Sequence, residues 1–113
     1  MLPLRIAARN TELTAAAEAD IRDHVARLAR FYKRIEGCTI TVDVPERHRK
    51  SQAKQYRVRL ELTLPGGEVV VNRQPHDELR TAVQDAFAAV RRRLEDYARR
   101  QRGSVKTRAW AAK

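Results

Sequence analysis

The stretch that decides the fold is ELRTAVQDAFAAVRRRLEDYARRQR, residues 78–102. Apolar side chains recur in it at steps of three and four residues, which places them on one face of an α-helix. These positions are Leu79, Val83, Phe87, Val90, Leu94 and Tyr97. No Gly or Pro interrupts the stretch, and Gly103 follows it as a helix stop. The sequence therefore predicts a helix roughly 37 Å long, whose apolar face closes a core.

The opposite face of this helix is strongly cationic. Its Arg side chains outnumber the two carboxylates that lie among them, Glu95 and Asp96. The cations are Arg91, Arg92, Arg93, Arg99, Arg100 and Arg102. We therefore predict that one side of the helix packs on the rest of the chain, while the other side offers positive charge to a partner.

The whole chain carries the same excess of positive charge. Its 113 residues suit a single domain, and they hold 24 Lys and Arg against 14 Asp and Glu, a formal charge of +10. Nineteen of the cations are Arg, whose planar guanidinium binds phosphate in a bidentate manner. This balance favours a polyanionic partner, either nucleic acid or an anionic membrane surface. A solvated basic face is the alternative that needs no partner.

Upstream of the long helix, the periodicity predicts four strands and one more helix. Alternating apolar residues indicate strands, which span residues 4–9, 38–44, 56–64 and 69–72. Steps of three and four predict a helix over residues 15–33, with Thr14 as its N-cap. Pro65-Gly66-Gly67 is typical of a hairpin turn between the last two strands. The polar stretch at residues 45–54 is expected to connect the second and third strands.

The order of elements, β-α-β-β-β-α, indicates an α+β fold with one four-stranded mixed sheet and two helices on one face. A right-handed crossover makes the first two strands parallel, and the next three strands form an antiparallel meander. We predict that residues 1–103 form one domain. Residues 104–113, SVKTRAWAAK, lack acidic groups and a clear period, so we expect a flexible basic tail there.

The sequence offers no recognisable constellation for catalysis or metal binding. The three His residues are scattered, and neither a CxxC nor an HExxH motif is present. Cys38 stands alone in an apolar strand and is expected to be a buried hydrophobic residue. We therefore expect no enzymatic activity, no cofactor, no metal ion and no small-molecule substrate.

The cellular compartment follows from the start of the chain and its single cysteine. Met1 leads directly into a strand, with no signal peptide and no apolar run long enough to span a bilayer. A lone cysteine suits a reducing interior. We expect a cytoplasmic protein with no membrane partner.

A second group of cations lies late in the first helix. Arg27 can pair with Asp23 one turn earlier. Arg30, Lys33 and Arg34 have no acidic residue four positions before them, so they join the long helix as candidate binding residues. The competing site is the open face of the sheet, which is expected to hold Arg5, Arg9, Arg57 and Arg59.

Four stretches resemble the family of ribosome hibernation-promoting factors and ribosome-associated translation inhibitors, also described as sigma-54 modulation proteins. They are RNTELT (9–14), ARLARFYKRI (26–35), LPGGEVVVNR (64–73) and PHDELRTAVQDAFAAVRRRLEDYARRQRG (75–103). The resemblance extends from Leu4 to Gly103 and implies a fold similar to a double-stranded-RNA-binding domain with an added first strand. The chain resembles the family's short form, which lacks a C-terminal dimerisation domain.

The resemblance implies non-enzymatic binding to the small ribosomal subunit, on 16S-type ribosomal RNA of the decoding region, where tRNA and mRNA bind. Such binding would inhibit translation and stabilise idle ribosomes under stress. By this resemblance, Arg27, Arg30 and Arg92 match basic positions of the family, and Arg99, Arg100 and Arg102 lie in the basic end of its second helix. The chain departs from the family at Ala89 and Asp96, where Lys is frequent, and at Arg80, where an aromatic residue is usual.

Two other classes of function stay open at this stage. One is a protein-interaction module that modulates the transcription machinery, and the other is a general module for structured RNA. Salt titration separates the first from RNA binding, which weakens steeply as salt rises. Aromatic residues are few, and Phe31 and Tyr32 are expected in the core. This scarcity argues against platforms that stack single strands and favours recognition of a folded RNA backbone.

Overall fold

Alternating apolar residues build a four-stranded sheet in the computed structural model, which describes residues 2–45 and 55–111. The strands are β1 (Leu4–Arg9), β2 (Gly37–Asp43), β3 (Arg57–Leu64) and β4 (Gly67–Asn72), in that spatial order. β1 and β2 are parallel, whereas β2–β3 and β3–β4 are antiparallel. The predicted mixed sheet is therefore confirmed.

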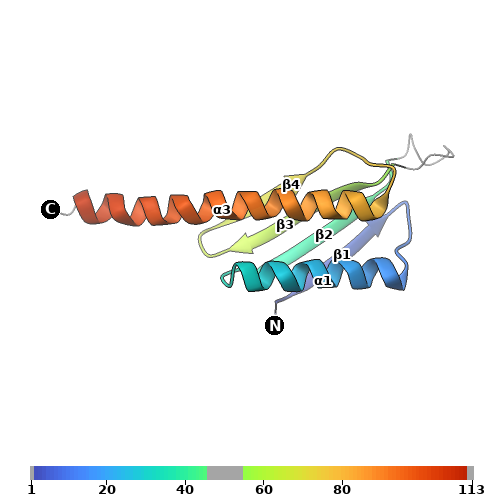
Figure 1. Ribbon diagram of the computed structural model, residues 1–113, viewed down its shortest axis with the longest axis horizontal. Helices are drawn as coiled ribbons and strands as arrows, with labels where there is room; N and C mark the ends of the chain where they lie inside the picture. Colours follow the sequence, from blue (N-terminus) through green and yellow to red (C-terminus); the bar gives the residue numbers. More distant parts are fainter. Residues whose placement is uncertain (1, 46–54, 112–113) are drawn as a thin grey trace.

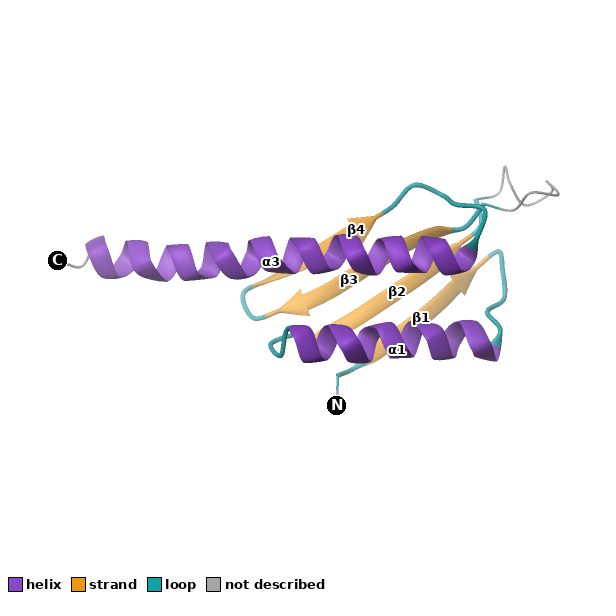
Figure 2. Cartoon of the chain, in the orientation of Figure 1, coloured by secondary structure: helices purple, strands orange, loops and turns teal. Residues whose placement is uncertain are grey.

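Two helices cover one face of this sheet (Figure 1). Helix α1 (Ala15–Phe31) connects β1 to β2, and helix α3 (Leu79–Ala111) follows β4. Thr14 caps α1 as predicted, because its Oγ1 accepts a hydrogen bond of 3.1 Å from the backbone N–H of Ala17. Figure 2 shows the helices side by side and running in the same direction, with α3 above β3 and β4. The α+β order β-α-β-β-β-α is confirmed.

The core lies between the helices and the strand residues that face them. Every second residue of β2, β3 and β4 is buried there, as the pleat of a strand requires. The fully buried side chains include Ile21, Ile40, Leu60, Leu62, Val83, Val90 and Leu94. The apolar stripe of α3 predicted from the sequence is therefore the face that packs on the sheet.

A hydrogen bond fixes α3 against the β3–β4 hairpin. Gly66 adopts a φ of 83°, which the tight turn needs and which a residue with a Cβ rarely adopts. The hydroxyl of Tyr97 donates a hydrogen bond of 2.8 Å to the carbonyl oxygen of Pro65 in this turn. The C-terminal part of α3 projects past the end of the sheet (Figure 1).

The prediction that Gly103 ends the long helix is wrong. Helix α3 continues without a break to Ala111. A glycine inside a helix costs only about 1 kcal/mol relative to alanine, and no proline follows to remove a backbone N–H. Residues 104–111 are therefore helical, whereas the division of the chain into a domain and a tail at residue 103 stays a prediction.

Smaller differences from the expected boundaries lie at chain turns. Helix α1 ends at Phe31 rather than Lys33, with Tyr32 as its extended C-cap. Tyr56 forms an isolated bridge with His76 instead of beginning β3. A connection was predicted for residues 45–54. Of these, only Pro45 belongs to the described residues.

Phe87→Ala tests the packing of α3. Phe87 is 6% exposed, and its ring stacks on that of His24 with 4.8 Å between centroids. The truncation should lower the free energy of unfolding by about 3–5 kcal/mol, measured by urea denaturation. Gln84→Ala, at an exposed position of the same helix, is the control and should change it by less than about 0.5 kcal/mol. Equal midpoints for the two variants would contradict the observed register.

Candidate nucleic-acid interface

The line along which α1 packs on α3, which we call the helix seam, brings the basic parts of both helices together. Two contacts mark it: the ring of His24 stacks on Phe87, and the guanidinium of Arg91 lies over the ring of Phe31. Because the helices run in the same direction, the end of α1 lies beside the middle of α3 (Figure 2). The cations at the end of α1 and in the turn after it therefore lie near Arg91 of α3.

The solvent side of the two helices, here called the helical face, carries the predicted binding residues. Every predicted cation whose side chain is described is exposed. These residues are Arg27, Arg30, Lys33, Arg34, Arg91, Arg92, Arg93, Arg99 and Arg100. Arg102 lies within α3, but its side chain is not among those that the structure describes. The helical face is therefore a candidate surface for an anionic partner.

The arginines of α3 point in different directions around the helix axis. Successive residues of a helix lie about 100° apart. Arg91 lies at the helix seam, and Arg92 and Arg99, seven residues apart, lie together on the outer side. Arg93 and Arg100 follow Arg92 and Arg99 by one residue each, so they lie about 100° further around α3, on the side away from α1. A partner that contacts all of them has to wrap around the projecting part of α3.

Two of these cations already have a carboxylate partner. Arg27 Nη2 lies 2.6 Å from Asp23 Oδ2, as the i,i+4 spacing predicted, and Arg99 pairs with Asp96. Both pairs are exposed, so each contributes only about 0–1 kcal/mol, and a phosphate can replace the carboxylate. Within the described part of the chain, no such pair forms at Arg30, Lys33, Arg34, Arg92, Arg93 or Arg100.

The competing cluster lies on the opposite side of the sheet, which we call the open face. Arg57 Nη2 lies 2.6 Å from Asp43 Oδ2, and Arg59 Nε lies 2.8 Å from Glu61 Oε1. A shallow hollow there is lined by Arg9, Thr41, Asp43, Arg57, Arg59 and Asn72. Because carboxylates lie among these cations, the open face presents less net positive charge than the helical face. It is the weaker candidate for a polyanion.

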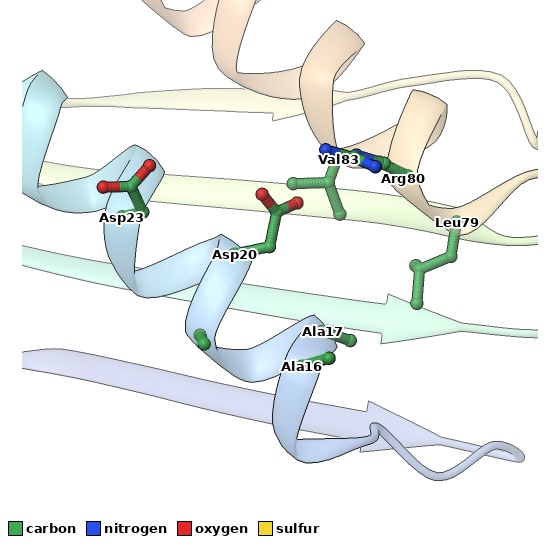
Figure 3. Close-up of a pocket in the computed structure, with 8 residues that line it drawn as sticks. Ala16, Ala17, Asp20, Asp23, Leu79, Arg80 and Val83 are labelled. Carbon is green, nitrogen blue, oxygen red and sulfur yellow. The ribbon is translucent and has the colours of Figure 1, made fainter.

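A groove of about 590 Å³ lies between the first halves of α1 and α3 (Figure 3). Small and apolar side chains form much of its lining, namely Ala16, Ala17, Ala19, Leu79 and Val83. Its charged groups are Asp20, Asp23 and Arg80. The two carboxylates of α1 repel phosphate, so this end of the helical layer does not suit a polyanion.

Other kinds of chemistry find little support in the described residues. Residues 2–45 and 55–111 hold no group of three or more His, Cys, Asp or Glu side chains arranged for a metal ion. None of the helices described combines the length and the apolar character needed to cross a membrane. Cys38 is buried, and burial raises the pKa of its thiol to about 11. The reactive thiolate is therefore disfavoured at neutral pH.

Phe31 is the residue of this surface that the sequence analysis assigned incorrectly. It was expected in the core, but it is 38% exposed at the end of α1. Tyr32 is half-buried and packs against the core. The apolar steps of α1 at residues 21, 25, 28 and 32 favour Tyr32 for the core, and Phe31 lies about 100° away from it around the helix. That offset is the signal by which the sequence could have identified an exposed ring.

Comparisons with known proteins agree with this architecture. The sequence model of a family described as sigma 54 modulation protein / S30EA ribosomal protein matches residues 4–102. The crystal structure of the Thermus thermophilus Protein Y N-terminal domain is similar with a TM-score of 0.69 at 20% identity, covering 86% of this chain and 99% of that one.

A ribosomal subunit interface protein from Coxiella burnetii is similar with a TM-score of 0.73 at 12% identity. The match covers 86% of this chain and 98% of that one. At these identities the likeness of the two structures shows the fold alone. No curated protein matches the chain by sequence.

The protonation of Cys38 should make stability depend on pH in the alkaline range. The pKa is raised from 9.0 to about 11 by burial, so the unfolded chain loses this proton first. The free energy of unfolding should therefore fall as the pH rises from about 9 to about 11. Urea denaturation across this pH range measures the decrease in the free energy of unfolding. In Cys38→Ala the contribution of the thiol to this decrease should be absent. Identical pH profiles for the two proteins would contradict the shift.

Proposed function

The chain belongs to the family of sigma 54 modulation proteins and S30EA ribosomal proteins, and from this premise we propose that it binds the small ribosomal subunit through its helical face. The binding site is 16S-type ribosomal RNA of the decoding region, where mRNA and tRNA bind. Occupation of that region inhibits translation without any catalytic step and stabilises idle ribosomes under stress. The protein acts in the cytoplasm, where ribosomes work.

The observation that carries this proposal is the gathering of exposed cations along one side of the molecule. Arg30 near the end of α1, together with Lys33 and Arg34 in the turn after it, joins Arg92 of α3, and all four are exposed. Each Lys or Arg that neutralises a phosphate releases a condensed counterion, so such a cluster binds RNA with a strong dependence on salt. Its sequence-independent contacts suit the backbone of folded ribosomal RNA.

The geometry of the helical layer supports an orientation for the RNA. Asp20 and Asp23 lie at the groove between the first halves of the helices, and the cations lie toward the other end. The RNA backbone is therefore attracted to the end of α1 and to the projecting part of α3. The name of the Coxiella burnetii protein, a ribosomal subunit interface protein with the same fold, supports a ribosomal partner.

Reversal of two charges on the outer side of α3 tests which face binds. Arg92→Glu with Arg99→Glu should strongly weaken binding to purified small subunits. It should also lower the slope of log affinity against log salt by somewhat under one unit per lost phosphate contact. Both side chains are exposed, so each change should alter the free energy of unfolding by only about 0.5 kcal/mol. Sedimentation with subunits at several salt concentrations gives affinity and slope.

The matched control is the double reversal on the open face, Arg57→Glu with Arg59→Glu. It changes the net charge by the same amount and should leave more affinity than the α3 variant. If the open-face variant loses binding while the α3 variant binds normally, the helical face is the wrong side. If the unmodified protein sediments without subunits at moderate salt, the ribosomal function itself is wrong.

We also propose that residues 1–103 are the ribosome-binding domain and that residues 104–113 act as a basic extension. The extension carries Lys106, Arg108 and Lys113, which can add phosphate contacts. A chain truncated after Gly103 should keep its urea midpoint and bind small subunits more weakly, with a smaller salt slope. Equal affinity at every salt concentration would show that the extension takes no part in binding.

A further inference from the structure

A guanidinium lies over an aromatic ring at the surface, where the helix seam reaches its basic end. Phe31 is 38% exposed, and among the described residues it is the one large hydrophobic side chain that is exposed. The guanidinium carbon of Arg91 lies 4.1 Å from the centroid of this ring. Arg91 is exposed as well, so both members of this pair face solvent.

Packing of the two helices does not account for the exposure of this pair. Earlier along the helix seam, Phe87 packs beneath His24 with its ring buried. Phe31 instead leaves more than a third of its surface in water. A guanidinium that stacks on a ring with one face keeps its other face free for a second planar group. Nucleobases stack on Arg planes and aromatic rings in just this way.

We propose that Phe31 and Arg91 form a stacking platform for one unpaired nucleobase of the bound RNA. The base lies on the outer face of the Arg91 guanidinium, and Phe31 holds that guanidinium flat from beneath. Arg27, one turn before Phe31 on α1, and Arg92, next to Arg91, place cations beside the platform for the flanking phosphates. The inference rests on the proposed function and adds a preference for RNA that exposes a base at this point.

The platform differs from the rest of the helical face in what it recognises. A phosphate contact does not depend on whether the RNA is single- or double-stranded, so an Arg-to-Lys change at such a contact weakens binding to both kinds of RNA by a similar factor. Stacking requires the planar group, which Lys lacks, so an Arg-to-Lys change at the platform keeps the charge and removes the stack. In a duplex the bases are paired and stacked on each other, so the platform finds no base there.

The experiment compares Arg91→Lys with Arg92→Lys, a neighbouring exposed arginine with no aromatic partner among the described residues. The probes are oligo(A) of about 12 nucleotides and a blunt RNA duplex of about 16 base pairs. Arg91→Lys should weaken oligo(A) binding about 5- to 150-fold, with the salt slope unchanged because the charge is kept. Its affinity for the duplex should fall by a much smaller factor. Arg92→Lys should change the affinities for oligo(A) and for the duplex by the same factor, because a phosphate contact does not distinguish the two RNAs.

Variants at Phe31 give a second measurement. Phe31→Leu keeps an apolar side chain without a ring and should show the same selective loss with oligo(A). Phe31→Trp, made together with Trp110→Phe, should keep the affinity and show fluorescence quenching on addition of oligo(A) and not of the duplex.

The platform would be overturned if Arg91→Lys and Arg92→Lys weakened oligo(A) binding by the same factor. It would also be overturned if Arg91→Lys weakened the binding of both RNAs by the same factor. Binding of the unmodified protein to small subunits but not to oligo(A) would overturn the platform alone. Absence of binding to small subunits and to both RNAs would overturn the proposed function together with it.

Discussion

The burial of the apolar stripe of α3 against β3 and β4 is the constraint on which the rest of the structure depends. Leu94 and Val90 are fully buried there, and removal of such side chains from water is the main favourable term in folding. The hydrogen bond from Tyr97 to Pro65 fixes the same helix at the end of the sheet. Because the apolar stripe of α3 faces the sheet, the arginines on the rest of the helix surface are exposed to solvent.

The parallel course of α1 and α3 turns two local charge patterns into one polar surface. Along α1, Asp20 and Asp23 come early and Arg27 and Arg30 come late, an order that also suits the helix dipole. Because α3 runs in the same direction, the cations at the end of α1 join those in the middle of α3. The helical layer thus has an acidic groove at one end and a cationic surface toward the other, which favours one orientation of a polyanion.

The two faces of the sheet differ in polarity, and this difference distinguishes the two candidate binding surfaces. The face under the helices is apolar, with Ile40 and Leu60 fully buried. On the open face, the antiparallel register places Arg57 directly across from Asp43, and the two side chains form an ion pair. Cross-strand pairing therefore consumes positive charge on the open face, whereas most cations of the helical face have no carboxylate within reach in the described chain.

Local periodicity carried most of the fold. Alternation in the strands, three-and-four steps in the helices and the Pro65-Gly66-Gly67 turn are short-range signals, and they were enough for the element order, the mixed sheet and the apolar face of α3. Net charge and the run at Arg91–Arg93 indicated a polyanionic partner. These signals can also be read from the sequence alone, because the charge of a side chain does not depend on which residues fold next to it. The end of α3 was predicted wrongly because the intrinsic cost of Gly103 is small beside the helical preference of the residues around it.

Tertiary structure decided what depends on residues distant in the sequence. Which arginines are engaged and which are free follows from the partners that folding brings near, as for Arg57 with Asp43. Phe31 is exposed at the end of α1, and the guanidinium of Arg91, sixty residues away in the sequence, lies over its ring. A linear pattern records that a residue is apolar or charged, whereas its exposure and its neighbours are set by how the helices pack on one sheet.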